Sequence, residues 1–153
     1  LTDGLDLDRD YVKSTKGVLP ATKFAVDCYV SFVKEKSILE GVTSSLTELF
    51  APKIHKERIL GMLENYNFIN DITMAYFKKR VTQATDDADF VLNYALKNAK
   101  TREEQDSVCD ALKFKTDVLW VMQDALYHSY INGHVPPGAF MPKDFDDRYT
   151  ESK

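Results

Sequence analysis

The sequence has few cysteines, few glycines and no long hydrophobic run. Among its 153 residues only Cys28 and Cys109 are cysteines. Two cysteines so far apart form neither a disulfide framework nor a zinc site, and we expect two reduced thiols in the core. The apolar runs are far shorter than the ~20 residues that span a bilayer. We therefore expect a cytoplasmic protein without a membrane partner.

The sequence also contains no segment in which charges of one sign are concentrated. The 20 basic and 24 acidic residues are interspersed, and the net charge is −4. A nucleic-acid-binding protein typically carries a basic stripe, so no nucleic-acid partner is expected. The three histidines, His55, His128 and His134, lack a second ligand at metal spacing, so we predict no metal site. The sequence also contains no P-loop, dinucleotide-binding fingerprint or nucleophile elbow.

Apolar residues recur at helical spacing, and no segment alternates with the period of a strand. Pro52 suits a first helical turn, Asn70 suits an N-cap, and Thr101 with Glu104 forms a capping box. These signals predict an all-α bundle. The predicted helices cover residues 21–36, 37–50, 52–65, 71–84, 85–99 and 102–132.

Lys115 is the most informative residue, because it interrupts the apolar seam of the last predicted helix. Val108, Lys115 and Met122 recur every seven residues along that seam. An unpaired buried ammonium costs several kcal/mol. The lysine therefore extends its ammonium into water, pairs with a carboxylate, or binds an anionic ligand.

Three further features place reactive groups at the edges of core-facing stripes. His55 and Arg58 share one helical face, and so do Tyr76 and Arg80. Glu48 ends a face built of small residues. Each feature has an ordinary structural alternative: solvated surface groups, an arginine lying on a tyrosine, or close helix packing. Together they indicate a pocket for a polycarboxylated ligand, with groups that can move protons.

At these residues the chain resembles the pyrroloquinoline-quinone synthase (PqqC) family, from about Gly17 to Phe140. The similar runs are LPATKFAVD (19–27), SSLTELFAP (44–52), IH (54–55), AYF (75–77) with Arg80, KFKTDVLW (113–120) and DALY (124–127). The resemblance implies a heme-oxygenase-like, TenA-like helical fold and a homodimer. It implies His55, Tyr76, Arg80 and Lys115 as catalytic residues, and Tyr29, Thr47, Glu48 and Arg58 as substrate-binding residues.

The resemblance also implies a reaction. A tricarboxylated precursor of pyrroloquinoline quinone (PQQ) would undergo ring closure and oxidation by O2, with release of H2O2 and without a cofactor; PQQ would be the product ligand. Two alternatives stay open: a heme-oxygenase-like relative with another reaction, one that could require iron, or a non-catalytic interaction module.

The chain departs from the family in length. It resembles the C-terminal part of the family's helical domain over residues 1–140, and residues 141–153 are expected to form a flexible tail. The family's first helices have no counterpart here, so we expect a half-built pocket and an exposed apolar face. Further partners would be a segment supplying those helices, or a PqqD-like peptide-chaperone domain.

Overall fold

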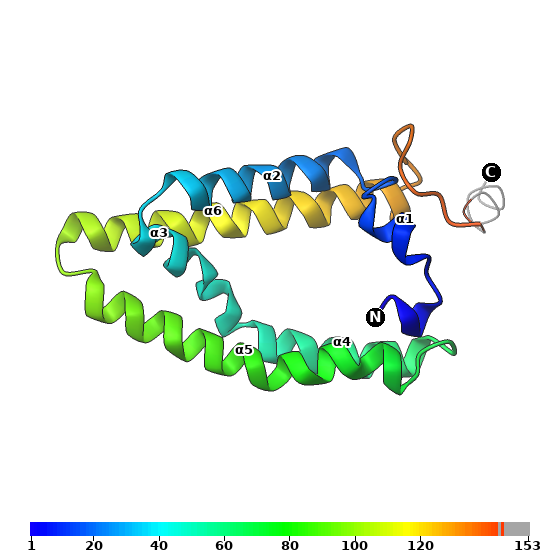
Figure 1. The fold of residues 1–153 in the computed structure, drawn as a ribbon, viewed down its shortest axis with the longest axis horizontal. Helices are drawn as coiled ribbons and strands as arrows, with labels where there is room; N and C mark the ends of the chain where they lie inside the picture. Colours follow the sequence, from blue (N-terminus) through cyan, green and yellow to red (C-terminus); the bar gives the residue numbers. More distant parts are fainter. Residues whose placement is uncertain (144, 146–153) are drawn as a thin grey trace.

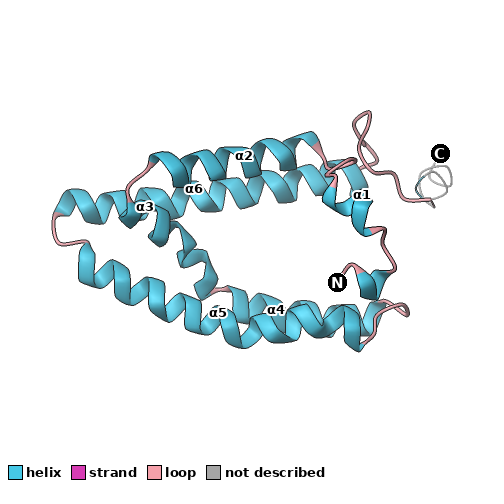
Figure 2. Ribbon diagram, viewed as in Figure 1, coloured by secondary structure: helices cyan, strands magenta, loops and turns pink. Residues whose placement is uncertain are grey.

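The computed structural model describes residues 1–143 and 145 of the chain, and these residues form helices and connecting loops, with no strand (Figure 2). The predicted all-α fold is confirmed. Most of the predicted tail, residues 144 and 146–153, lies outside the described residues. In chain order the elements are η1 (Asp3–Leu5), α1 (Arg9–Lys13), α2 (Pro20–Glu35), α3 (Ile38–Thr43), η2 (Ser44–Leu49), α4 (Ala51–Asn65), α5 (Asp71–Asn98), α6 (Arg102–Leu126) and η3 (Tyr127–Ile131).

The helices form two pairs joined by a connecting segment. Helix α2 lies along α6 and α4 lies along α5, while α3 and the 3-10 helix η2 run from one pair to the other (Figure 1). Met74, the largest of the fully buried side chains, lies on α5 with the buried Ala84 and Val91, and the buried Ala111 and Val118 lie on α6. Segment α3–η2 contacts both α5 and α6, so it is the element that brings groups from both pairs together.

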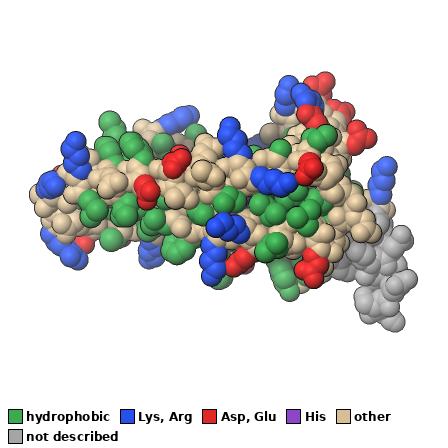
Figure 3. Space-filling view, turned by 90° about the horizontal axis from the view of Figure 1, so that it is seen from below, with side chains coloured by type: hydrophobic (Ala, Val, Ile, Leu, Met, Phe, Trp, Pro, Cys, Tyr) green, Lys and Arg blue, Asp and Glu red, His purple; other side chains and the backbone are tan. Residues whose placement is uncertain are grey.

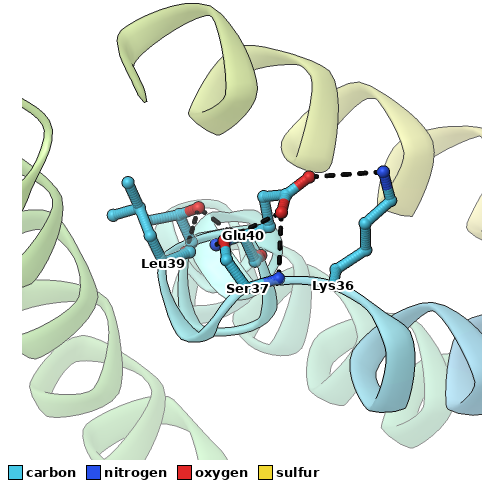
Figure 4. Close-up of polar contacts among 5 residues, drawn as sticks. Lys36, Ser37, Leu39 and Glu40 are labelled. Carbon is cyan, nitrogen blue, oxygen red and sulfur yellow. Dashed lines mark hydrogen bonds and ion pairs between the residues drawn. The ribbon is translucent and has the colours of Figure 1, made fainter. Parts of the chain in front are cut away.

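The predicted helix over residues 37–50 is divided in two. It begins with a capping box, in which the backbone N–H of Ser37 donates to Glu40 at 3.0 Å and that of Glu40 donates to Ser37 Oγ at 3.2 Å (Figure 4). The hydroxyls of Thr43 and Ser44 then donate to the carbonyls of Leu39 and Gly41, both at 2.7 Å. Hydroxyls that bond back to helix carbonyls bend a helix. From Ser44 the chain continues as the tighter η2.

The predicted boundary between residues 84 and 85 is wrong, because α5 runs unbroken from Asp71 to Asn98. Thr85 does not cap a new helix: its hydroxyl donates to the Val81 carbonyl at 3.2 Å, inside the helix. Ala84 and Ala88 are 0% and 3% exposed, so the buried stripe continues through this point. The start at Thr101 and Glu104 is confirmed, while α6 ends at Leu126 and a π-helical turn, η3, follows it.

Large apolar side chains are exposed on several elements, as predicted. Phe24, Leu60, Phe90 and Trp120 each expose more than 60% of their surface, with values of 70%, 68%, 64% and 71%. Figure 3 shows hydrophobic groups between the charged groups on one such face. The core placement predicted for the two cysteines is wrong, since both are exposed free thiols. Among the described residues, no helix has the length and apolar character needed to cross a membrane.

Candidate functional site

Arg80 lies at the centre of an ion-pair cluster that we call the Arg80 cluster: Glu48, Arg80 and Asp87. One terminal nitrogen of the guanidinium, Nη2, donates to Glu48 Oε2 at 2.6 Å, and the other, Nη1, donates to Asp87 Oδ2 at 3.1 Å. The Arg80 side chain is 17% exposed. Burial acts to lower the pKa of Arg80, but the bond to Asp87 and the charge of Glu48 outweigh it and raise that pKa. Arg80 is therefore a permanent cation.

The cluster joins two elements that are distant in sequence. Glu48 comes from η2, and Arg80 and Asp87 come from α5, where seven residues place them two turns apart on one face. All three line an open hollow of about 670 Å³, whose apolar wall includes Val42 and Phe90. The hollow thus combines an apolar wall with the Arg80 cation and the two carboxylates that hold it.

His55 lies on α4, beside the cluster. Its ring centroid is 6.0 Å from that of Phe77, and its buried Nδ1 has no hydrogen-bond partner within the described part of the chain. Burial lowers the pKa of His55, and the charges of Arg58 and Arg80 lower it further, while Glu48 opposes them. The imidazole is therefore held neutral at neutral pH, the form that accepts a proton.

Arg58 and Tyr76 meet at the same aromatic ring. The guanidinium carbon of Arg58 lies 5.7 Å from the centroid of Phe77, and the Tyr76 ring meets Phe77 edge-on at 5.3 Å between centroids. Both side chains belong to exposed residues. The side chains of Arg58, His55 and Tyr76 thus all contact the ring of the buried Phe77.

Lys115 forms a second group with Tyr29, at the contact between α6 and α2. Its ammonium nitrogen lies 3.5 Å from the centroid of the Tyr29 ring, and the residue is half-buried. Within residues 1–143 and 145, the partner of this ammonium is therefore the face of an aromatic ring. The Tyr29 hydroxyl shares a 3.0 Å hydrogen bond with Ser44 Oγ, which ties this group to η2.

The structure accordingly divides seven of the eight predicted site residues between two groups linked by η2, and the eighth, Thr47, lies in η2 itself. Five of these residues lie in or beside the Arg80 cluster: Glu48, Arg80, His55, Arg58 and Tyr76. Tyr29 and Lys115 form the second group. Thr47 is half-buried in η2 next to Glu48, and its carbonyl accepts a hydrogen bond from the Phe50 backbone at 3.2 Å.

The sequence prediction missed Asp87 and Ser44. The spacing of Arg80 and Asp87, two helical turns, would have pointed to Asp87 if the helix had been predicted as continuous. Ser44 gave no signal, because its partner Tyr29 is 15 residues away on another helix. Within the described residues no group of three or more His, Cys, Asp or Glu side chains could hold a metal ion. The metal-free site stays a prediction.

The lowered pKa of His55 predicts a pH-dependent stability difference. The usual pKa of a histidine side chain is 6.5. Below that pH the unfolded chain takes up the proton first, so this residue's contribution favours folding above pH 6.5 and is lost as the pH falls towards the folded-state pKa. Replacing His55 with Gln should remove that loss.

Denaturant unfolding of both proteins at about pH 7.5 and about pH 5.5 measures the effect. The wild type should lose more free energy of unfolding than His55→Gln does. His128 and His134 are common to both proteins and cancel in the comparison. Equal losses would contradict a lowered pKa of His55 in the folded chain.

The chain is similar to known proteins over most of its length. The family model of the TENA/THI-4/PQQC family matches residues 1–125. The chain is 61% identical over 144 residues to the pyrroloquinoline-quinone synthase of Bradyrhizobium sp. (strain ORS 278), covering 94% of this chain and 56% of that protein. It is 60% identical over 144 residues to that of Cereibacter sphaeroides (strain ATCC 17025 / ATH 2.4.3), with the same coverage.

A third relative, the pyrroloquinoline-quinone synthase of Rhodopseudomonas palustris (strain TIE-1), is 57% identical over 145 residues, covering 95% of this chain and 57% of that protein. The chain thus spans a little more than half the length of these curated relatives. The family agrees with the helical, heme-oxygenase-like fold. Because the family model matches most of the residues and the identities are high, the chain belongs to the TENA/THI-4/PQQC family.

Proposed function

We propose that the protein containing this chain is an oxidoreductase of PQQ biosynthesis. It closes a ring in a tricarboxylated precursor and oxidises it to PQQ. Each O2 consumed takes two electrons and two protons from the substrate and leaves as H2O2. The observation that supports this most strongly is the 61% identity, over 94% of the chain, to a protein named pyrroloquinoline-quinone synthase.

The cationic groups suit a ligand of three carboxylates. Two of the five N–H donors of Arg80 are used by Glu48 and Asp87, which leaves three for a ligand. Lys115 and Arg58 add two more positive charges, and neither has a carboxylate partner in the described structure. The 2.6 Å bond between Glu48 and Arg80 supports a role for Glu48 in orienting this cation.

Proton movement in this proposal uses His55 and Tyr76. A neutral His55 accepts a proton from a ring position of the reduced substrate, and the resulting imidazolium lies beside a newly negative ligand. An electron-rich, deprotonated quinol then gives its electrons to O2 directly. The proposal therefore needs no resident cofactor. It further includes a homodimer, which the family resemblance implies, and a cytoplasmic location.

The experiment mixes the full-length protein with the precursor under anaerobic conditions and then admits O2. We expect stable binding without oxygen, followed by the PQQ absorbance and H2O2 once oxygen enters. Iron analysis of the same sample addresses the alternative reaction. Precursor binding without oxidation would favour a non-catalytic module, and oxidation that scales with bound iron would favour the iron-dependent alternative; either would contradict the proposal.

A further inference from the structure

Asp87 is the second carboxylate on the Arg80 guanidinium, and the chemistry proposed above gives it no role. It accepts from Nη1 at 3.1 Å, while Glu48 accepts from Nη2 at 2.6 Å. The two carboxylates therefore hold opposite ends of a planar group. A guanidinium held at both terminal nitrogens cannot turn about its Nε–Cζ bond without breaking these hydrogen bonds.

The position of Asp87 is fixed by the backbone of α5. Arg80 and Asp87 are separated by two turns of one helix, and Ala84 and Ala88, buried at 0% and 3% exposure, anchor that segment in the core. A helix break at residue 85 would have moved Asp87 away from Arg80. The unbroken helix thus sets the distance between the two groups before any ligand binds.

The exposures of the Arg80 and Asp87 side chains differ in a way that suits a positioning role for Asp87. Arg80 is 17% exposed, whereas Asp87 is 47% exposed and lines the same open hollow. A carboxylate that keeps about half its contact with water loses little hydration free energy. It can still orient a cation that is mostly buried. The arginine therefore faces the hollow with a set orientation.

We propose that Asp87 is a positioning residue, which fixes the orientation of the Arg80 guanidinium so that its remaining N–H donors meet an anionic ligand. The proposal rests on the proposed function in taking PQQ as that ligand. Asp87 itself has no contact with the ligand. Its effect on binding passes through Arg80.

The test is a double-mutant cycle on PQQ affinity, measured by titration of the full-length protein. Asp87→Asn should weaken binding about tenfold, the size expected for one charge-assisted hydrogen bond. Asp87→Glu, which keeps the charge, should recover part of the loss. In an Arg80→Lys background, which lacks the planar fork, Asp87→Asn should change the affinity by less than about twofold.

Asp89→Asn is the matched control, since Asp89 is an exposed carboxylate on the same helix. It should leave the affinity within about twofold of the wild type. Equal losses from Asp87→Asn in both backgrounds would overturn the proposal, because the effect would then not pass through Arg80. So would a wild-type affinity in Asp87→Asn itself.

A second measurement separates this proposal from the proposed function. NMR of the arginine side chains should show slow rotation of the Arg80 guanidinium in the wild type and in Asp89→Asn, and fast rotation in Asp87→Asn. If the wild type fails to bind PQQ, the proposed function fails, but this difference still supports the positioning role. Fast rotation in the wild type, or slow rotation in Asp87→Asn, would overturn it.

Discussion

Arg80→Ala is expected to weaken PQQ binding by about 100-fold or more, because the ligand loses charge-assisted hydrogen bonds that each contribute about 1.5–3 kcal/mol. The same change leaves Glu48 and Asp87 without the cation that both contact. These carboxylates are 31% and 47% exposed, so water screens much of their repulsion. We therefore expect the free energy of unfolding to fall by about 1–3 kcal/mol, less than for a fully buried pair.

Titration with PQQ and denaturant unfolding measure the two effects on one sample. Lys79→Ala is the matched control, since it removes an exposed cation from the neighbouring position of α5. Arg80→Lys keeps the charge and separates it from the planar geometry. Unchanged PQQ affinity in Arg80→Ala would remove Arg80 from the site, whatever the change in stability.

Lys115→Ala is expected to weaken PQQ binding by about 50-fold, with only a small loss of stability. The ammonium lies on the Tyr29 ring, and a cation–π contact at a half-exposed position contributes about 0.5–1 kcal/mol. A ligand carboxylate would be a stronger partner for this charge than a ring face is. The lysine is therefore held in place by the fold and keeps its N–H donors for an anion.

The same titration and unfolding measurements apply, with Lys113→Ala as control, because Lys113 is exposed on the same helix. Tyr29→Phe keeps the ring face and loses only the bond to Ser44, so it should preserve most of the affinity. Tyr29→Leu removes the ring face and should weaken PQQ binding, but by less than Lys115→Ala does. A Lys115→Ala protein that is strongly destabilised but binds PQQ normally would indicate a purely structural lysine.

Much of the fold could be predicted because its helix starts are encoded locally. The caps at Ser37, Asn70 and Thr101 are each made by a side chain within three residues of the backbone group it satisfies. The wrong helix boundary arose where a hydroxyl could either cap a new helix or bond to a carbonyl within a continuing one. Thr85 looked like a cap, but it bonds to the carbonyl one turn back, and only the buried neighbours Ala84 and Ala88 decide between the two.

For the candidate site, the sequence indicated which neighbouring residues share a helical face, but not which distant residues pair. A spacing of three or four residues, such as that of His55 and Arg58, predicts that both side chains lie on one helical face. The bond between Arg80 and Glu48 spans 32 positions and depends on how η2 crosses α5. The partner of Lys115 was likewise decided by the packing of α2 on α6, which no local pattern specifies.

The exposed cysteines show a related limit. Cys28 and Cys109 lie on the helices of the α2–α6 pair, and cysteine is among the residue types most often found inside proteins. Their exposure follows from which faces of these helices pack together. Composition alone does not contain that information.

The central claim is that the Arg80 cluster and the Tyr29–Lys115 pair serve one anionic ligand. A crystal structure of the full-length protein with PQQ tests it most directly. We predict that a single PQQ molecule accepts hydrogen bonds from both the Arg80 guanidinium and the Lys115 ammonium, with His55 beside it. A PQQ molecule that contacts only one of these cations, or binds elsewhere, would contradict the account.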